Sequence, residues 1–191
     1  VERSLSKGQV ALADQITKNV PIYDMARHRS GLEQAKARKA LLSEWAHVLL
    51  SGPGVLVLRA AYRSTDVLDE ATAIYNRIIA DEKARAGGGA DHFAASGAND
   101  RVWNSLEKLS DADPDVFLRY FANSAIAGAC EAWLGPNYQM TAQVNLVHPG
   151  GAAQLAHRDY HLGFQTAEIS ARYPAHVHDL SPALTLQGAV A

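Results

Sequence analysis

The spacing of apolar residues changes near residue 139, and this change divides the chain into a helical part and a strand part. Before this point apolar side chains recur every three or four residues, as on one face of a helix. Over residues 140–147 they alternate with polar residues, as on a half-buried strand. Helices followed by strands indicate an α+β protein in which helices pack against a β-sandwich or barrel.

Three helices are predicted in the first part, over residues 32–51, 64–86 and 113–135. Each ends at or just before a glycine, and the first and third also have a proline next to that glycine. The second starts with a serine or threonine cap and has carboxylates in its first turn, where the helix dipole favours negative charge. The third starts at an Asp-Pro pair, which caps a helix and fixes its first turn.

Three other stretches receive coarser predictions. The first thirty residues are weakly patterned, and we expect them to cover the surface of the domain. Residues 55–58 are short and rich in branched side chains, which favours a buried strand. Residues 87–113 form a long connection rich in glycine, alanine and aspartate, with one short helix. A connection of this length is either a lid over a binding site, which would include Phe93 and Trp103, or a plain surface loop.

The predicted strand at 140–147 places its polar side chains on one face. Thr141, Gln143 and Asn145 are two positions apart, so they point the same way on an extended backbone. A strand of this kind fits the wall of a barrel whose interior holds a polar site. The alternative is a face that is simply solvated.

His157 and Asp159 lie two residues apart in a second alternating run, after a Pro-Gly-Gly turn. On a strand their side chains share one face, so an imidazole and a carboxylate can converge on one metal ion. Such a pair is part of a two-histidine, one-carboxylate iron site. The alternative is a histidine hydrogen-bonded to a nearby aspartate. The Cα atom of His161 would lie about 13 Å from that of His157, too far to bind the same ion, so we interpret His161 as a neighbour or a substrate contact.

A second histidine cluster, His176-Val177-His178, lies between two prolines and is predicted to be a loop. Zinc would need further ligands, and the sequence offers none nearby. Solvated loop histidines are therefore the favoured interpretation. A zinc hydrolase that uses this cluster stays an alternative function.

Composition and charge narrow the classes of function. The 191 residues are enough for one domain with a core, and a net charge of −2 without a basic stretch argues against a nucleic-acid surface. No apolar run approaches the roughly 20 residues that span a bilayer, which argues against a membrane segment. Cys130 is the single cysteine, and we expect a buried structural thiol in a reducing, cytoplasmic setting.

Both ends of the sequence favour a fragment of a longer protein. The chain starts without methionine and stops within a strand-like pattern at 184–191. We expect one oxygenase-like domain over residues 1–191, mainly helical at 1–136 and with the first strands of a β-barrel at 137–191. This fragment alone is not expected to be active.

The segment HPGGAAQLAHRDYHLGFQ, which follows MTAQVNLV, resembles the phytanoyl-CoA dioxygenase family of iron(II)- and 2-oxoglutarate-dependent oxygenases. The similarity runs loosely from about residue 41 to residue 191 and includes GPGVLVLRAAY, GANDRVWNSLEKL and ALTLQGAVA. It implies a double-stranded β-helix, also called a jelly roll or cupin-like barrel, with flanking N-terminal helices and with the barrel incomplete in this chain. It also implies a hydroxylase that uses iron(II), 2-oxoglutarate and O2 on a small-molecule substrate.

The resemblance also implies roles for particular residues. His157 and Asp159 match the first two iron ligands. The candidates for binding 2-oxoglutarate are Asn145, Gln143 and Arg101. The family's second histidine ligand, and its arginine for the far carboxylate of 2-oxoglutarate, come later in the chain order, beyond residue 191. A cupin-like binding protein that has lost the oxygenase activity is the alternative function.

Substrate contacts are predicted next to these positions, at Tyr160, His161 and Trp103. Trp103 belongs to the connection that would act as a lid, and the other two directly follow the predicted iron ligands. The identity of the substrate does not follow from these residues.

Overall fold

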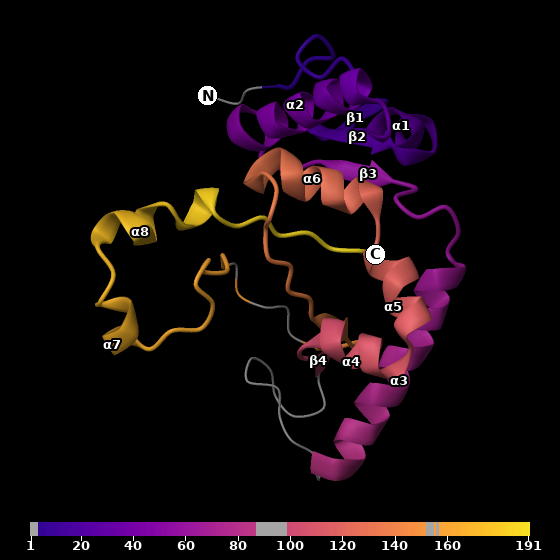
Figure 1. Cartoon of the computed structure of the whole chain (residues 1–191), viewed down its shortest axis with the longest axis vertical. Coiled ribbons are helices and arrows are strands. Elements are labelled where there is room, and N and C mark those ends of the chain that lie inside the picture. Colours follow the sequence, from indigo (N-terminus) through magenta and orange to yellow (C-terminus); the bar gives the residue numbers. More distant parts are fainter. Residues whose placement is uncertain (1–3, 87–98, 152–154, 156) are drawn as a thin grey trace. The chain divides into compact units, whose positions relative to one another are not determined.

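The computed structural model describes residues 4–86, 99–151, 155 and 157–191 (Figure 1). Helices and small sheets form two compact units, so the mixed α+β class is confirmed. Each unit is described by itself. Unit 1 consists of Val1–Ala61, Ser124–Tyr138 and His157–Ala191, and unit 2 consists of Tyr62–Asn123 and Gln139–Ala156.

The sheet of unit 1 has three short strands in the order β1-β2-β3. Their bounds are Gln15–Thr17 for β1, Val20–Asp24 for β2 and Val57–Arg59 for β3. Strands β1 and β2 are antiparallel, whereas β2 and β3 are parallel. Lys18 and Asn19, which join β1 to β2, both have positive φ, as the two-residue turn of a tight hairpin requires. The strand predicted at 55–58 is thus shifted to 57–59, and it is not buried, because Val57 is 42% exposed.

Three helices of unit 1 pack around one core. They are α1 (Met25–Leu32), α2 (Ala35–Ser51) and α6 (Ser124–Leu134). The Asp24 carboxylate caps α1 by accepting a hydrogen bond from the Ala26 N–H at 3.0 Å. The prediction that the first thirty residues cover the surface was wrong, because this core includes fully buried side chains at Val10, Ala13, Tyr23 and Met25.

The C-terminal part of unit 1 contains two short helices and a 3-10 turn. These are α7 (Ala167–Ser170), α8 (Ala175–Asp179) and η1 (Ser181–Ala183). After η1 the chain runs back beside α6, where the Trp133 indole N–H donates to the Thr185 carbonyl at 3.0 Å (Figure 1). His176 and His178, which were predicted to lie in a loop, are in α8.

Two predicted strands of unit 1 are not formed in the described residues. Residues 157–160 and 184–191 belong to neither a helix nor a strand. A strand needs a neighbour that takes up its backbone N–H and C=O groups. Within the part of the chain that the structure describes, no strand pairs with either segment.

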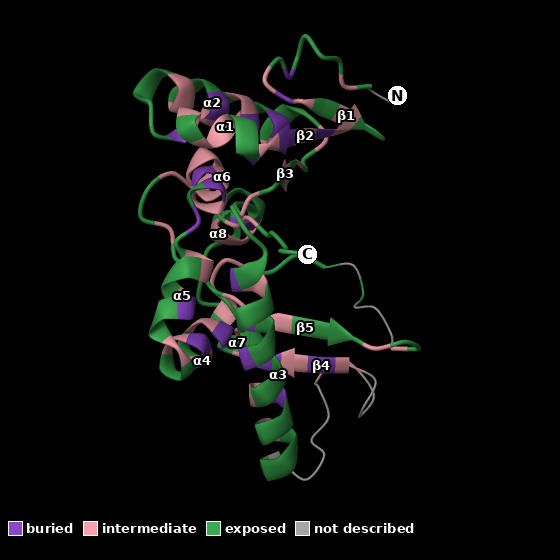
Figure 2. Cartoon of the chain, turned by 90° about the vertical axis from the view of Figure 1, so that its right-hand side faces the viewer, coloured by how far each residue is buried: buried purple, intermediate pink, exposed green. Residues whose placement is uncertain are grey.

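Unit 2 consists of three helices and a two-stranded sheet. They are α3 (Asp66–Ala86), α4 (Ser105–Ala112), α5 (Pro114–Phe121), β4 (Asn99–Val102) and β5 (Val144–Val147). The predicted caps are confirmed, since the Ser64 hydroxyl accepts from the Asp66 N–H and the Asp113 carboxylate accepts from the Val116 N–H. The buried side chains of α3, α4, α5 and β4 form a second core (Figure 2).

Three predictions change in unit 2. The helix predicted over 113–135 ends at Phe121, and a separate helix, α6 of unit 1, starts at Ser124. Residues 99–102, expected in a long connection, form β4, whereas the short helix predicted in that connection is present as α4. The strand predicted over 140–147 is shorter, at 144–147.

The sheets are smaller than the resemblance implies. A jelly roll has eight strands in two sheets, whereas the described residues form five strands in two small sheets and no jelly roll. No helix in the described part of the chain has the length and apolar character that crossing a membrane would require.

Candidate metal and cosubstrate site

His157 and Asp159, here called the HxD pair, converge in unit 1 although they do not lie on a strand. His157 Nε2 lies 3.4 Å from Asp159 Oδ1, and the two side chains are 50% and 63% exposed. Bonds of about 2.1 Å to nitrogen and to oxygen allow one ion to join two atoms that are up to roughly 4.2 Å apart. The pair therefore fits the donor types and the spacing of a shared first-row metal ion.

The same distance fits the alternative interpretation, an aspartate paired with a histidine. A complete protein site would need a third donor. Within the described ranges, no group of three or more histidine, cysteine, aspartate or glutamate side chains is placed to hold a metal ion. This finding also gives no support to a zinc site at His176 and His178.

The two residues after Asp159 are attached to the following short helices. The Tyr160 hydroxyl lies 2.7 Å from Nδ1 of His178, and the two rings stack with centroids 5.7 Å apart. The His161 backbone N–H donates to the Ser181 hydroxyl at 3.3 Å, and its ring meets the Tyr160 ring edge to face. His178, which sequence reasoning assigned to a solvated loop, is thus half-buried and in contact with the segment of the HxD pair.

Unit 2 brings together three of the predicted ligand-binding residues. Arg101 of β4 lies directly opposite Asn145 of β5 in the antiparallel ladder. The Arg101 guanidinium carbon lies 4.8 Å from the centre of the Trp103 ring, in cation–π geometry. Gln143 directly precedes β5 and is exposed, as is Asn145, while Val144 between them is half-buried. The predicted polar face is therefore present over residues 143–145.

A charged cluster that sequence reasoning missed lies on the other face of this ladder. The Asp100 side chain is only 8% exposed, with Oδ1 2.6 Å from Lys83 Nζ and Oδ2 2.7 Å from His148 Nε2. Burial alone would raise the pKa of the Asp100 carboxyl, but the hydrogen bonds from Lys83 and His148 hold that pKa below its usual range. The sequence offered one signal that this carboxylate faces the core. Asp100 lies two residues before the apolar Val102, so on a strand both side chains point to the same face.

Cys130 of α6 has the character expected of a structural thiol. Burial raises the pKa of its thiol, although a hydrogen bond with Tyr138 opposes this shift. A raised pKa keeps the thiol protonated, so its nucleophilic thiolate form is scarce.

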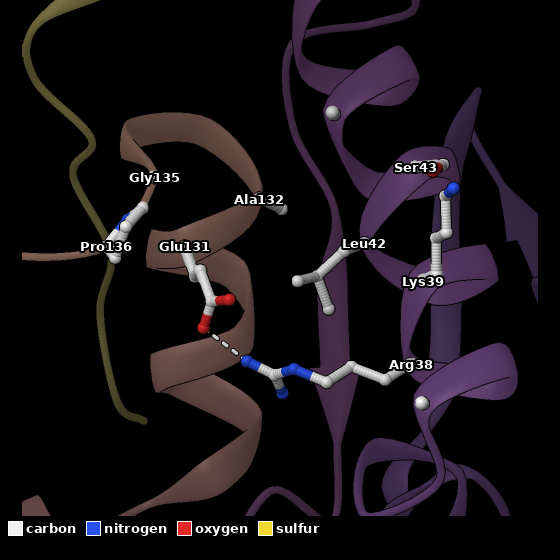
Figure 3. Close-up of a pocket in the computed structure, with 10 residues that line it drawn as sticks. Arg38, Lys39, Leu42, Ser43, Glu131, Ala132, Gly135 and Pro136 are labelled. Carbon is white, nitrogen blue, oxygen red and sulfur yellow. Dashed lines mark hydrogen bonds and ion pairs between the residues drawn. The ribbon is translucent and has the colours of Figure 1, made fainter.

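A groove of about 530 Å³ lies between α2 and α6 in unit 1 (Figure 3). Arg38 and Glu131 form an ion pair across it, and Leu42 and Ala132 provide apolar walls. None of the predicted iron, cosubstrate or substrate residues lines this groove.

Comparison with known families bears on these residues. The family model for phytanoyl-CoA dioxygenase (PhyH) matches residues 50–185, a range that includes the HxD pair and the β4–β5 ladder. Searches of curated proteins and of solved structures found no match. Because the match covers well over half of the sequence, the chain belongs to the phytanoyl-CoA dioxygenase family.

Proposed function

We propose that this chain belongs to an iron(II)- and 2-oxoglutarate-dependent dioxygenase that hydroxylates an unactivated C–H bond of a small organic substrate. The observation that carries the proposal is the convergence of His157 Nε2 and Asp159 Oδ1 within 3.4 Å, inside a family of 2-oxoglutarate oxygenases. The proposal includes the double-stranded β-helix that the family implies and one oxygenase-like domain over residues 1–191.

In this proposal His157 and Asp159 hold the iron, and the third ligand is a histidine that the family places later in the chain order. Bound iron(II) would supply the redox chemistry that couples decarboxylation of 2-oxoglutarate to oxidation of the substrate by O2. The protein's own task is to fix the two donor atoms and to keep positions on the metal open for cosubstrate and oxygen.

Binding of 2-oxoglutarate is assigned to residues of unit 2. A guanidinium group such as that of Arg101 pairs with carboxylates through charge-assisted hydrogen bonds. The amide of Asn145, its cross-strand partner, can both donate to and accept from the cosubstrate, and Gln143 offers the same groups. Substrate contacts are assigned to Tyr160, His161 and Trp103.

The proposal is tested with the full-length protein under anaerobic conditions. Iron(II) and 2-oxoglutarate are added, and the visible charge-transfer band of their complex is recorded for wild type, His157→Ala and His47→Ala. His47 is an exposed histidine of α2 and serves as the matched control. We expect the band in wild type and in His47→Ala, and its loss in His157→Ala. Absence of the band in wild type would overturn the proposal.

The second candidate function is a cupin-like binding protein without oxygenase activity. The lack of a third metal donor among the described residues is compatible with both functions, because the oxygenase would take its third ligand from later in the chain order. Succinate production separates the two functions, because only an active oxygenase converts 2-oxoglutarate to succinate in the presence of O2. A protein that binds metal and 2-oxoglutarate but forms no succinate with any substrate tested would be such a binding protein.

A further inference from the structure

The HxD pair lies in a segment that no backbone ladder holds in place. Residues 157–160 are in neither a helix nor a strand, and both side chains of the pair are at least half exposed. A metal site needs its donor atoms held within a fraction of an ångström. Side-chain contacts of neighbouring residues must therefore restrain this segment.

Two adjacent contacts provide such a restraint within unit 1. Tyr160 binds His178 of α8 through its hydroxyl at 2.7 Å and through ring stacking. The next residue, His161, donates its backbone N–H to Ser181 of η1. Because Tyr160 directly follows Asp159, the contact with α8 acts one residue away from a proposed ligand.

The helices that receive these contacts are themselves held in place. The Thr185 hydroxyl donates to the Ser181 carbonyl at 3.0 Å, and the Thr185 carbonyl accepts from the Trp133 indole of α6 at 3.0 Å. A continuous series of contacts therefore runs from Tyr160 through α8 and η1 to α6, a helix of the core of unit 1.

We propose that His178 is a positioning residue for the metal site, which acts by accepting the Tyr160 hydroxyl hydrogen bond and so restrains the HxD pair. This inference rests on the proposed function, in which His157 and Asp159 are metal ligands. For the Tyr160 hydroxyl to donate, Nδ1 of His178 must be the acceptor, so its ring proton is on Nε2. His178 then supports a ligand segment and is not itself a ligand.

The test measures the affinity of the full-length protein for Mn(II), a redox-inert probe of the iron site, by electron paramagnetic resonance. The variants are Tyr160→Phe, His178→Ala, their double mutant and His178→Asn. The side-chain oxygen of asparagine takes nearly the place of Nδ1 and can accept the same hydrogen bond. His176→Ala is the matched control, because His176 lies two residues before His178 on α8 and is exposed.

We expect Tyr160→Phe and His178→Ala each to weaken Mn(II) binding about tenfold, the lower end of the range found for groups that hydrogen-bond to metal ligands. The double mutant should be no weaker than the single mutants, because both remove the same hydrogen bond. His178→Asn should restore much of the affinity, and His176→Ala should bind as wild type does. A purely structural role would lower the unfolding temperature without this pattern in Mn(II) affinity.

His157→Ala separates the failure of this inference from the failure of the proposed function. If His157→Ala still binds Mn(II) as wild type does, the proposed metal site is wrong. If His157→Ala loses binding while Tyr160→Phe and His178→Ala keep wild-type affinity, the site stands and the positioning role is wrong. Complete loss of binding in His178→Ala, without recovery in His178→Asn, would make His178 a ligand and would also overturn the inference.

Discussion

The carboxylate of Asp100 and the imidazole of His148 meet at 2.7 Å on the side of the β4–β5 ladder that faces α3. Lys83 of α3 binds the second oxygen of the same carboxylate at 2.6 Å. One buried side chain of β4 thus links α3 to the residue that directly follows β5. Arg101, the next residue along β4, lies on the opposite face and pairs with Asn145. The cluster therefore restrains the ladder that presents the proposed cosubstrate residues.

We predict that Asp100→Asn lowers the free energy of unfolding by about 1–3 kcal/mol. The substitution keeps the shape of the side chain but removes the charge that accepts hydrogen bonds from Lys83 and His148, and bonds to charged groups contribute amounts of this order. Urea unfolding at neutral pH measures the change. Asp111→Asn, at an exposed position of α4, is the control and should leave stability within about 0.5 kcal/mol of wild type. Equal stability of the two variants would contradict this role of the cluster.

The same carboxylate predicts a dependence of stability on pH. Its pKa in the folded state is lowered below the usual 3.8, so its contribution is present above that value and is lost as pH falls through the folded-state pKa. The difference in stability between wild type and Asp100→Asn should therefore shrink as pH falls below about 4. Unfolding curves of both proteins at a series of pH values measure it. A difference that grows as pH falls below about 4 would show that the sign is wrong.

Local signals in the sequence were sufficient to predict where α3 and α5 begin, but they did not indicate α1, α7 or α8. The caps at Ser64 and Asp113 act within one helical turn, and both are found in the structure. Strand β4 was missed because its sequence, Asn-Asp-Arg-Val, shows no apolar alternation of its own and pairs with β5, more than forty residues later. Contacts at such separation depend on the fold as a whole, which a local pattern does not contain.

In the candidate site, too, short-range features were predictable from the sequence and contacts between distant residues were not. The spacing of His157 and Asp159 predicted that their side chains converge, and they do so at 3.4 Å, although the segment is not the strand from which that prediction was made. Tyr160 and His178 are 18 residues apart in the sequence and belong to two separate local patterns, yet their side chains are in contact. Sequence reasoning assigned Tyr160 as a substrate contact and His178 as a solvated loop histidine, and it could not show that they meet.

Close packing of α6 on α2 predicts that Gly128 does not tolerate a larger side chain. A Cβ atom at Gly128 would lie 3.0 Å from the fully buried Trp45 ring, closer than carbon atoms pack without displacement. We expect Gly128→Val to lower stability by about 1–3 kcal/mol through overpacking. Ala127→Val on the same helix is the control, because Ala127 is only half-buried. Thermal unfolding compares them, and equal loss in the two variants would indicate that helix propensity and not packing is responsible.

The pairing of Arg101 with Asn145 leads to a kinetic prediction for the proposed oxygenase. Arg101→Ala should raise KM for 2-oxoglutarate about tenfold or more while changing kcat less, because a lost carboxylate contact weakens ground-state and transition-state binding alike. Arg101→Lys should recover part of this loss, since lysine keeps the charge but not the planar, two-pronged donor geometry. Arg77→Ala, at an exposed position of α3, is the matched control.

KM and kcat are measured with the full-length protein by following succinate formation at varied concentrations of 2-oxoglutarate. The Arg101 guanidinium also stacks on Trp103, so a change in intrinsic tryptophan fluorescence on adding 2-oxoglutarate anaerobically gives a second, activity-independent readout. We expect this signal in wild type and Arg77→Ala and its loss in Arg101→Ala. An unchanged KM in Arg101→Ala, together with an unchanged fluorescence response, would remove the β4–β5 face from the cosubstrate site while leaving the assignment of the HxD pair intact.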